Sequence, residues 1–191
     1  MKLVLASTSP FRKAILDKLG IPFDTVSPET DETALENESP QGLVERLSIA
    51  KAKAVADKMS KSLVIGSDQV SVIDGEIIGK PHTHENAVKQ LQNASGKTVT
   101  FYTGLCLYNS ETQQYQSEVV PFEVVFRQLS DQQIDSYLRK EEPYNCAGSF
   151  KSEALGIVLF EKLQGEDPNT LMGLPLIRLV KMLEQEKFSI L

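Results

Sequence analysis

The sequence has little of the chemistry that marks disulfide-rich, redox or zinc-binding proteins. It contains two cysteines, Cys106 and Cys146. Neither has a partner at the spacing of a metal or redox motif, which favours reduced thiols and a cytoplasmic protein. The two histidines, His82 and His84, lie together in Pro-His-Thr-His. We expect this stretch to form the turn that enters a helix rather than a metal site.

Long hydrophobic runs and an excess of positive charge are also absent. Residues 1–5 begin like a signal peptide, but the apolar run is too short for one. No stretch is long enough to span a membrane. The net charge of −6 disfavours a broad nucleic-acid surface, which needs a basic face. We therefore expect neither nucleic acid nor a membrane as a partner, whereas a small anionic ligand needs only a local cluster of cations.

The chain does contain alternating strand and helix signals over 191 residues, of which 41% are hydrophobic. This favours a single domain over residues 1–191 with a sizeable core, either in one body or in two lobes with the site in a cleft. Strands are predicted at 3–6, 23–26, 63–65, 98–108, 119–126 and 156–160, and a hairpin turning at Asp74-Gly75 at 70–78. Helices are predicted from 10, 40, 85, 134 and 175. The order predicts an α/β fold, a twisted mixed β-sheet flanked by helices.

The stretch ASTSPFRK, residues 6–13, joins the first strand to the first helix. Ser9 is a good N-cap and Pro10 suits the first helical position, so the hydroxyl-rich residues form a turn with free backbone N–H groups. Such a turn favours an anion, and the nearby cations Arg12 and Lys13 fit a strongly negative group in front of them. The turn is not a Walker loop, because it has no glycine. The alternative is a capped surface helix with two solvated cations.

Other charged residues supply the remaining parts of a phosphate site. In LVIGSDQV, residues 63–70, a buried strand runs into Asp68, which we expect at its carboxyl end, where open α/β sheets bind ligands. Glu32 lies in an acidic loop, Lys51 on the long helix, and Lys80 in Gly-Lys-Pro after the hairpin. Carboxylates for a hard cation and cations for phosphates are the parts of metal-assisted nucleotide hydrolysis. Singly, each residue could instead cap a turn or be solvated.

Seven stretches together resemble the Maf family of nucleoside-triphosphate pyrophosphatases. They are ASTSPFRK, Asp31-Glu32, LSIAKA, IGSDQV, GKP, FYTGL and GEDPNTLMGLPL, in this order along nearly the whole chain. The resemblance implies cleavage of a nucleoside triphosphate to a monophosphate and pyrophosphate. Two features differ from the commoner family pattern: Phe11 precedes Arg12-Lys13, where many members have two arginines, and Gln69 follows Asp68, where threonine is common. With CAGSFKSE at 146–153, these features resemble the subgroup that acts on 7-methyl-GTP.

The resemblance also implies the roles of the site residues. Glu32 and Asp68 would coordinate Mg²⁺ or Mn²⁺, and Asp68 would accept the proton of the attacking water. The residues expected to bind phosphate are Ser7, Arg12, Lys13, Lys51 and Lys80. Those expected to set base specificity are Phe11, Gln69 and Glu153. Lys13 lacks the bidentate geometry of the usual arginine.

The base-reading residues each have a second interpretation. Phe11 would stack on the cationic methylated base, unless it is a core residue of its helix. Glu153 would accept hydrogen bonds from the base edge, unless it is simply solvated. Gln69 can both donate and accept a hydrogen bond.

The resemblance implies a small-molecule nucleotide as the substrate and a homodimer as the assembly. Two alternatives remain open. One is a pyrophosphatase for another nucleotide, such as inosine, xanthosine or pyrimidine triphosphate. The other is a nucleotide-binding regulator of cell division without turnover, which the presence of both Glu32 and Asp68 disfavours.

Overall fold

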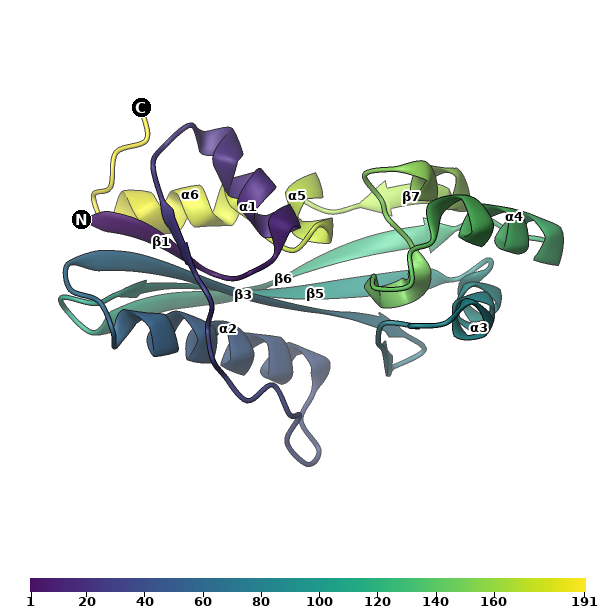
Figure 1. Ribbon diagram of the computed structural model, residues 1–191, viewed down its shortest axis with the longest axis horizontal. Coiled ribbons are helices and arrows are strands. Elements are labelled where there is room, and N and C mark those ends of the chain that lie inside the picture. Colours follow the sequence, from purple (N-terminus) through teal and green to yellow (C-terminus); the bar gives the residue numbers. More distant parts are fainter. The chain divides into compact units, whose positions relative to one another are not determined.

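The computed structural model describes residues 1–191, and Figure 1 shows the arrangement of its elements. In chain order these are β1 (Lys2–Ala6), α1 (Pro10–Leu16), η1 (Asp17–Leu19), β2 (Asp24–Val26), α2 (Pro40–Ala56), β3 (Ser62–Ile73), β4 (Glu76–Ile78), α3 (His84–Ala94), β5 (Thr98–Asn109), β6 (Gln114–Phe126), α4 (Asp131–Glu141), η2 (Ala147–Ser149), η3 (Leu155–Leu159), β7 (Phe160–Gln164), α5 (Pro168–Leu171) and α6 (Leu176–Gln185). None of the helices combines the length and apolar character that crossing a membrane requires.

The strands form one seven-stranded sheet, in the order β2-β1-β3-β5-β6-β7, with β4 paired to β3. β1 runs parallel to both β2 and β3. β4 is antiparallel to β3, and β7 is antiparallel to β6. The sheet is therefore mixed, and the predicted α/β fold class is confirmed.

The chain divides into two compact units. The first comprises residues 1–69, 103–120 and 167–191, and the second comprises residues 70–102 and 121–166. Three boundaries fall within β3, β5 and β6, and the fourth falls between β7 and α5. The single domain expected from the sequence remains a prediction.

The core of the first unit has a helical layer on each face of the sheet. Figure 1 shows α1 and α6 on one face and α2 on the other. Leu3 and Leu5 of β1 pack in the cluster that includes helix residues such as Leu179, whereas Val4 packs with Ala52 of α2. Successive strand residues point to opposite faces, so a strand covered on both faces is apolar at every position. This explains why the first strand reads as a continuous apolar run.

The second unit contains an aromatic cluster. Phe101, Phe126, Phe150 and Phe160 meet edge to face, with ring centroids 5.0–5.5 Å apart. Such edge-to-face contacts add to the stabilisation from the buried area. α3 and α4 pack against each other in this unit.

Several local predictions are confirmed. Ser130 and Gln133 form a capping box on α4. Asp74 and Gly75 both have positive φ, 52° and 88°, as a tight hairpin between β3 and β4 requires. Ser39 caps α2 by accepting a hydrogen bond from the N–H of Gly42 at 3.1 Å.

The strand predicted at 156–160 is wrong. Residues Leu155–Leu159 form a 3₁₀ helix, and the strand β7 begins only at Phe160. The chain folds back on itself here, since the N–H of Gly156 donates to the carbonyl of Lys151 at 3.1 Å. A Cβ on Gly156 would lie 2.2 Å from that carbonyl oxygen, so only glycine permits the turn. The apolar residues Ile157 and Val158 remain exposed.

Candidate active site

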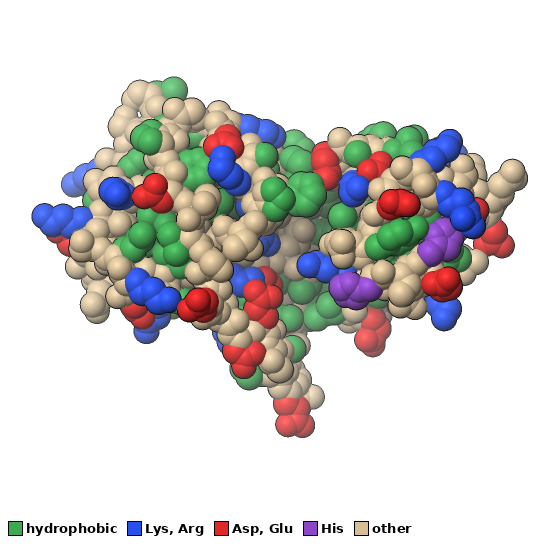
Figure 2. All heavy atoms as spheres, in the orientation of Figure 1, with side chains coloured by type: hydrophobic (Ala, Val, Ile, Leu, Met, Phe, Trp, Pro, Cys, Tyr) green, Lys and Arg blue, Asp and Glu red, His purple; other side chains and the backbone are tan.

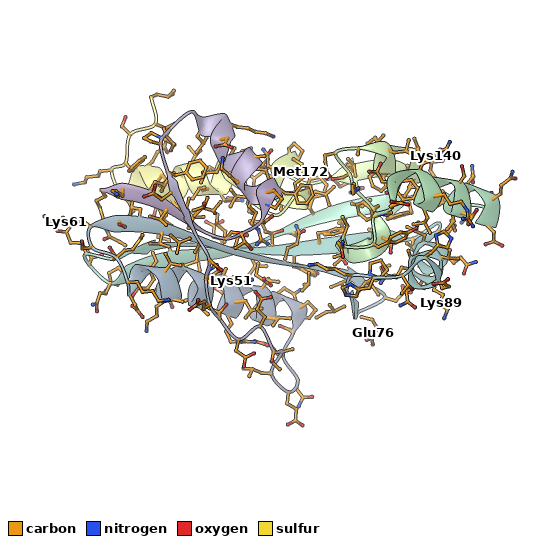
Figure 3. The ribbon with its side chains drawn as sticks, in the orientation of Figure 1. Lys51, Lys61, Glu76, Lys89, Lys140 and Met172 are labelled. Carbon is orange, nitrogen blue, oxygen red and sulfur yellow. The ribbon has the colours of Figure 1, made fainter.

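Lys51 holds the centre of a charged cluster in the first unit. It lies on α2, where the helix faces the strands, and is labelled in Figure 3. Its Nζ lies 2.6 Å from Oδ1 of Asp68 and 2.7 Å from Oε1 of Glu32. Lys53, two residues further along the helix, is exposed instead. The structure thus brings together three of the residues that the sequence singled out.

Close packing between α2 and β3 brings Asp68 to Lys51. Gly66 lies against the helix: a Cβ there would be 2.1 Å from the carbonyl oxygen of Ser48 and 2.8 Å from the backbone nitrogen of Ala52. Any larger residue would push the strand away from the helix. The absence of a side chain at Gly66 therefore lets the ion pair form two residues later.

The prediction that Asp68 lies at the end of its strand is wrong. It is an internal residue of β3, which continues to Ile73. The parallel pairing of β1 with β3, however, ends at Leu5 and Ile65. Asp68 therefore lies just beyond the carboxyl end of the parallel segment, although its own strand continues into the pairing with β4.

Glu32 comes to the cluster from a segment without helix or strand, residues 27–39. Figure 2 shows acidic side chains gathered along this segment, which projects beyond the first turn of α2 in Figure 1. The Glu32 side chain is 61% exposed, against 7% for Lys51. The cluster therefore has a buried carboxylate on one side and an accessible one on the other.

Arg12 adds a second cation in the same unit. Its Nε donates to the carbonyl of Gly173 at 2.9 Å, and its two terminal nitrogens donate no hydrogen bond within the chain. Burial lowers the pKa of Arg12, and the negative charges of Asp68 and Glu32 oppose that shift. The guanidinium thus lies within electrostatic reach of both carboxylates and still has donors available for an anion.

The turn before α6 orients this arginine, a role that the sequence did not reveal. Gly173 has a φ of 101°, which favours glycine, and its carbonyl also accepts from Oγ of Ser67 at 2.8 Å. Asp167 fixes the turn by accepting from the N–H groups of Asn169 and Ile177 at 2.8 and 2.9 Å. The motif GEDPNTLMGLPL, quoted for the resemblance without a role, carries these groups. The helix-capping pair Asp167-Pro168, followed by Gly173, was the signal in the sequence that could have indicated this turn.

Ser7 lies in the predicted turn and is buried. Its Oγ accepts from the N–H of Ser9 at 3.1 Å, and Ser9 in turn caps α1 by accepting from the N–H of Arg12. The hydroxyl proton of Ser7 has no acceptor within the chain, so it can be donated to a ligand.

The two residues beside Arg12 differ in their surroundings. Lys13 pairs with Asp17 at 2.9 Å and lies 5.6 Å from the centre of the Phe23 ring. No contact joins Lys13 to the Lys51 cluster, so its phosphate-binding role remains a prediction from the resemblance. Phe11 is 44% exposed and is therefore not a core residue of its helix.

Gln69 has a fixed orientation. Its Nε2 donates to Oγ1 of Thr103 at 2.7 Å and to the carbonyl of Thr170 at 2.8 Å. A backbone carbonyl only accepts, so the amide nitrogen must face it. The side-chain amide therefore has only its oxygen left for a ligand.

Two further predicted residues, Lys80 and Glu153, lie in the second unit, and both are exposed. Glu153 accepts a hydrogen bond from the hydroxyl of Ser152 at 3.3 Å. The predicted helix entry nearby in the chain is confirmed, because Thr83 caps α3. His84 contacts Asp135 and the hydroxyl of Tyr144, each at 3.0 Å.

The two carboxylates of the cluster supply ligand atoms of the kind that a hard divalent cation prefers, namely oxygens. Because one oxygen of Glu32 and one of Asp68 both lie within 2.7 Å of Lys51 Nζ, the two carboxylates lie near each other around that ammonium group. No group of three or more His, Cys, Asp or Glu side chains is placed to hold a metal. Mg²⁺ is usually bound by one or two carboxylates of the protein together with substrate phosphates. Two carboxylates therefore match the number of protein ligands that it usually has.

Known proteins are similar to this chain over nearly its whole length. A family model described as Maf-like protein matches residues 2–186. The chain belongs to the Maf family. It is 60% identical over 189 residues to "7-methyl-GTP pyrophosphatase" of Colwellia psychrerythraea, covering 99% of this chain and 94% of that protein. It is 57% identical over 189 residues to the protein of the same name in Nitrosococcus oceani, covering 99% and 95%.

Among solved structures, this Maf-family chain is similar to a HAM1 protein from Coxiella burnetii. The identity is 16%, the TM-score is 0.49, and the match covers 66% of this chain and 73% of the other.

Proposed function

We propose that this protein hydrolyses 7-methyl-GTP to 7-methyl-GMP and pyrophosphate, by attack of water on the α-phosphorus. The observation that carries the proposal is the position of Lys51 Nζ between the carboxylates of Asp68 and Glu32. The class of enzyme, a nucleoside-triphosphate pyrophosphatase, is supported by membership of the family and by the name of the two relatives. Their similarity extends over almost the full length of both chains.

Asp68 has the atoms needed for a proton acceptor. Its Oδ1 accepts from Lys51, and its Oδ2 accepts no hydrogen bond within the chain. We assign Oδ2 as the atom that orients the attacking water and takes its proton. Lys51 fixes the other oxygen, which restricts the rotation of the carboxylate.

Positive charge would stabilise the triphosphate as the bond to pyrophosphate breaks. Arg12 has free terminal donors, and the hydroxyl of Ser7 has no acceptor within the chain. Donors placed before the reaction begins need no reorganisation when charge develops on the phosphate oxygens. Lys13 and Lys80 are assigned to phosphate only by the family resemblance.

A divalent cation, Mg²⁺ or Mn²⁺, would be held by Glu32 and Asp68. When bound, it would neutralise negative charge on the phosphate oxygens and on the leaving pyrophosphate. The two carboxylates would favour a hard cation, because all their ligand atoms are oxygens.

Recognition of the base is assigned to Phe11, Gln69 and Glu153. The methylated guanine is cationic, so it would stack more favourably on an exposed aromatic ring such as Phe11 than neutral guanine does. Gln69 would contribute its oxygen as an acceptor for a base N–H group. Glu153 would add a negative charge and further acceptors. We also propose a cytoplasmic homodimer, on the family resemblance alone.

Hydrolysis of a nucleotide panel by the purified protein tests this function. The panel contains 7-methyl-GTP, GTP, inosine triphosphate, xanthosine triphosphate, UTP and dTTP, with and without Mg²⁺ or Mn²⁺. We expect the highest kcat/KM for 7-methyl-GTP, with the monophosphate and pyrophosphate as products. Preference for inosine or xanthosine triphosphate would favour the alternative pyrophosphatase. Tight binding of a nucleotide without turnover would favour the regulator.

A further inference from the structure

The segment that carries Glu32 is not held by the hydrophobic core. Residues 27–39 contain no helix or strand, and the Glu32 side chain is 61% exposed. Leu35, the large apolar residue of this segment, is itself 60% exposed. Segments with few buried apolar contacts open at low cost in free energy. Side-chain hydrogen bonds must therefore define where Glu32 lies.

Arg46 makes the principal contacts of this kind. It lies on α2, and its Nε donates to Oε1 of Glu38 at 2.6 Å while its Nη2 donates to Oε2 of the same residue at 2.7 Å. The same Nη2 donates to the carbonyl of Thr33 at 3.1 Å. Thr33 directly follows Glu32 in the chain, so Arg46 binds the backbone next to the candidate metal ligand.

Glu38 extends this contact into the segment. Its Oε2 also accepts from the N–H of Leu35 at 3.0 Å. The carboxylate therefore joins Arg46 to two positions of the segment, and its side chain is only 10% exposed. A bidentate arginine–carboxylate pair restricts geometry as well as adding attraction, which separates it from ordinary surface ion pairs.

We propose that Arg46 is a positioning residue for the reaction: its contacts with Glu38 and Thr33 hold the 27–39 segment so that Glu32 reaches the Lys51 cluster. The inference rests on the proposed function, since it assigns Glu32 a part in catalysis. Two cations of α2 thus contact different parts of the same segment. Lys51 binds the Glu32 carboxylate at 2.7 Å, and Arg46 fixes the backbone that presents it.

Electrostatics favour the same arrangement. Hydrogen bonding to Glu38 raises the pKa of Arg46, and the charges of Asp31 and Asp68 add to this.

Hydrogen exchange of the free protein tests the positioning without any turnover. Arg46→Met and Glu38→Gln should speed the exchange of the amides of residues 33–38 by about tenfold, because the opened segment is no longer tied to α2. Arg46→Lys keeps the positive charge but loses the bidentate geometry of the guanidinium, so it should speed the exchange by less than Arg46→Met does. Arg139→Met is the matched control, as it removes an exposed arginine whose Nε donates to Asp135 at 2.7 Å. Unchanged exchange in Arg46→Met and Glu38→Gln would overturn the proposal.

A double-mutant cycle shows whether Arg46 acts through Glu32. Arg46→Met should lower kcat/KM for 7-methyl-GTP about tenfold in the wild-type background and less than about twofold in the Glu32→Gln background. An equal loss in both backgrounds would contradict a positioning role and indicate a general structural effect. If Arg46→Met fails to fold, the nearly isosteric Glu38→Gln replaces it in the cycle. Lack of turnover by the wild type would reject the proposed function, whereas the exchange measurement would still report on the segment.

Discussion

Lys51 and Asp68 form a shielded ion pair, with 2.6 Å between Nζ and Oδ1 and side chains only 7% and 13% exposed. Removal of water from charged groups is costly, and the attraction between the partners offsets that cost only while both are present. Glu32 approaches the same nitrogen from the accessible side. Lys51 thus contacts both Asp68, the proposed proton acceptor, and Glu32, a proposed metal ligand.

Replacement of this cation should cost stability as well as activity. Lys51→Met keeps most of the side-chain volume but leaves Asp68 buried without its partner, so we expect a loss of about 3 kcal/mol in the free energy of unfolding. Urea denaturation measures it. Adding Asp68→Asn to Lys51→Met should restore part of the loss, because no unpaired charge remains. A single variant as stable as the wild type would show that the pair is hydrated rather than buried.

Gly173→Ala should impair activity through Arg12. Its φ of 101° is strained for alanine, and the new Cβ would lie 3.2 Å from Nε of Arg12. We expect a stability loss of about 1–3 kcal/mol from the backbone and a loss of about tenfold in kcat/KM from the displaced guanidinium. Gly20→Ala is the control, since Gly20 has a φ of 65° and nothing within 4 Å of its added Cβ. Equal activity losses in both variants would leave no special role for the contact with Arg12.

Gln69→Glu should be less stable than Gln69→Met. The glutamate would place a carboxylate oxygen against the carbonyl of Thr170, which now accepts from Nε2 at 2.8 Å. We expect the charged variant to be about 2 kcal/mol less stable than the methionine variant, which lacks the bond but adds no repulsion. Thermal and urea unfolding at neutral pH compare them. The opposite order would contradict the hydrogen bond from Gln69 to the carbonyl of Thr170.

The Glu38 carboxyl should titrate far below an ordinary glutamate. Hydrogen bonding from Arg46 lowers its pKa from 4.5 to about 2. Because the folded pKa is the depressed one, the contact stabilises the segment fully above the unfolded pKa, and this stabilisation is lost as the pH falls from 4.5 through about 2. A carboxyl NMR titration measures the midpoint. It should return toward 4.5 in Arg46→Met, and an unchanged midpoint in that variant would contradict the assigned cause.

Local signals predicted much of the fold. The continuous apolar runs in β1 and at the start of β3 identified strands covered on both faces, and the capping residues Ser9, Ser39 and Ser130 identified helix starts. These signals work because the residues that cause each element lie within it. The length of β3 was not predictable in this way. Its polar middle, Ser67 to Gln69, lies between the residues that pair with β1 and those that pair with β4.

The site was predictable in its residue types but not in its contacts. Lys51 and Lys53 are two residues apart on a helix, so they point in nearly opposite directions, and the structure buries Lys51 and exposes Lys53. The carbonyl of Gly173 could not be foreseen, because it is a backbone atom 161 residues from the arginine that it orients. The contacts of Arg46 depend on the path of residues 27–39. This segment has no helix or strand, so no sequence periodicity predicts its path.

The position of bond cleavage tests the central claim most directly. Hydrolysis of 7-methyl-GTP in water labelled with oxygen-18, followed by mass spectrometry of both products, identifies the phosphorus that water attacks. Attack at the α-phosphorus predicts the label in 7-methyl-GMP and none in pyrophosphate, at a rate about a hundredfold lower in a folded Asp68→Asn protein. Label in pyrophosphate, release of 7-methyl-GDP and phosphate, or an undiminished rate in Asp68→Asn would contradict the account.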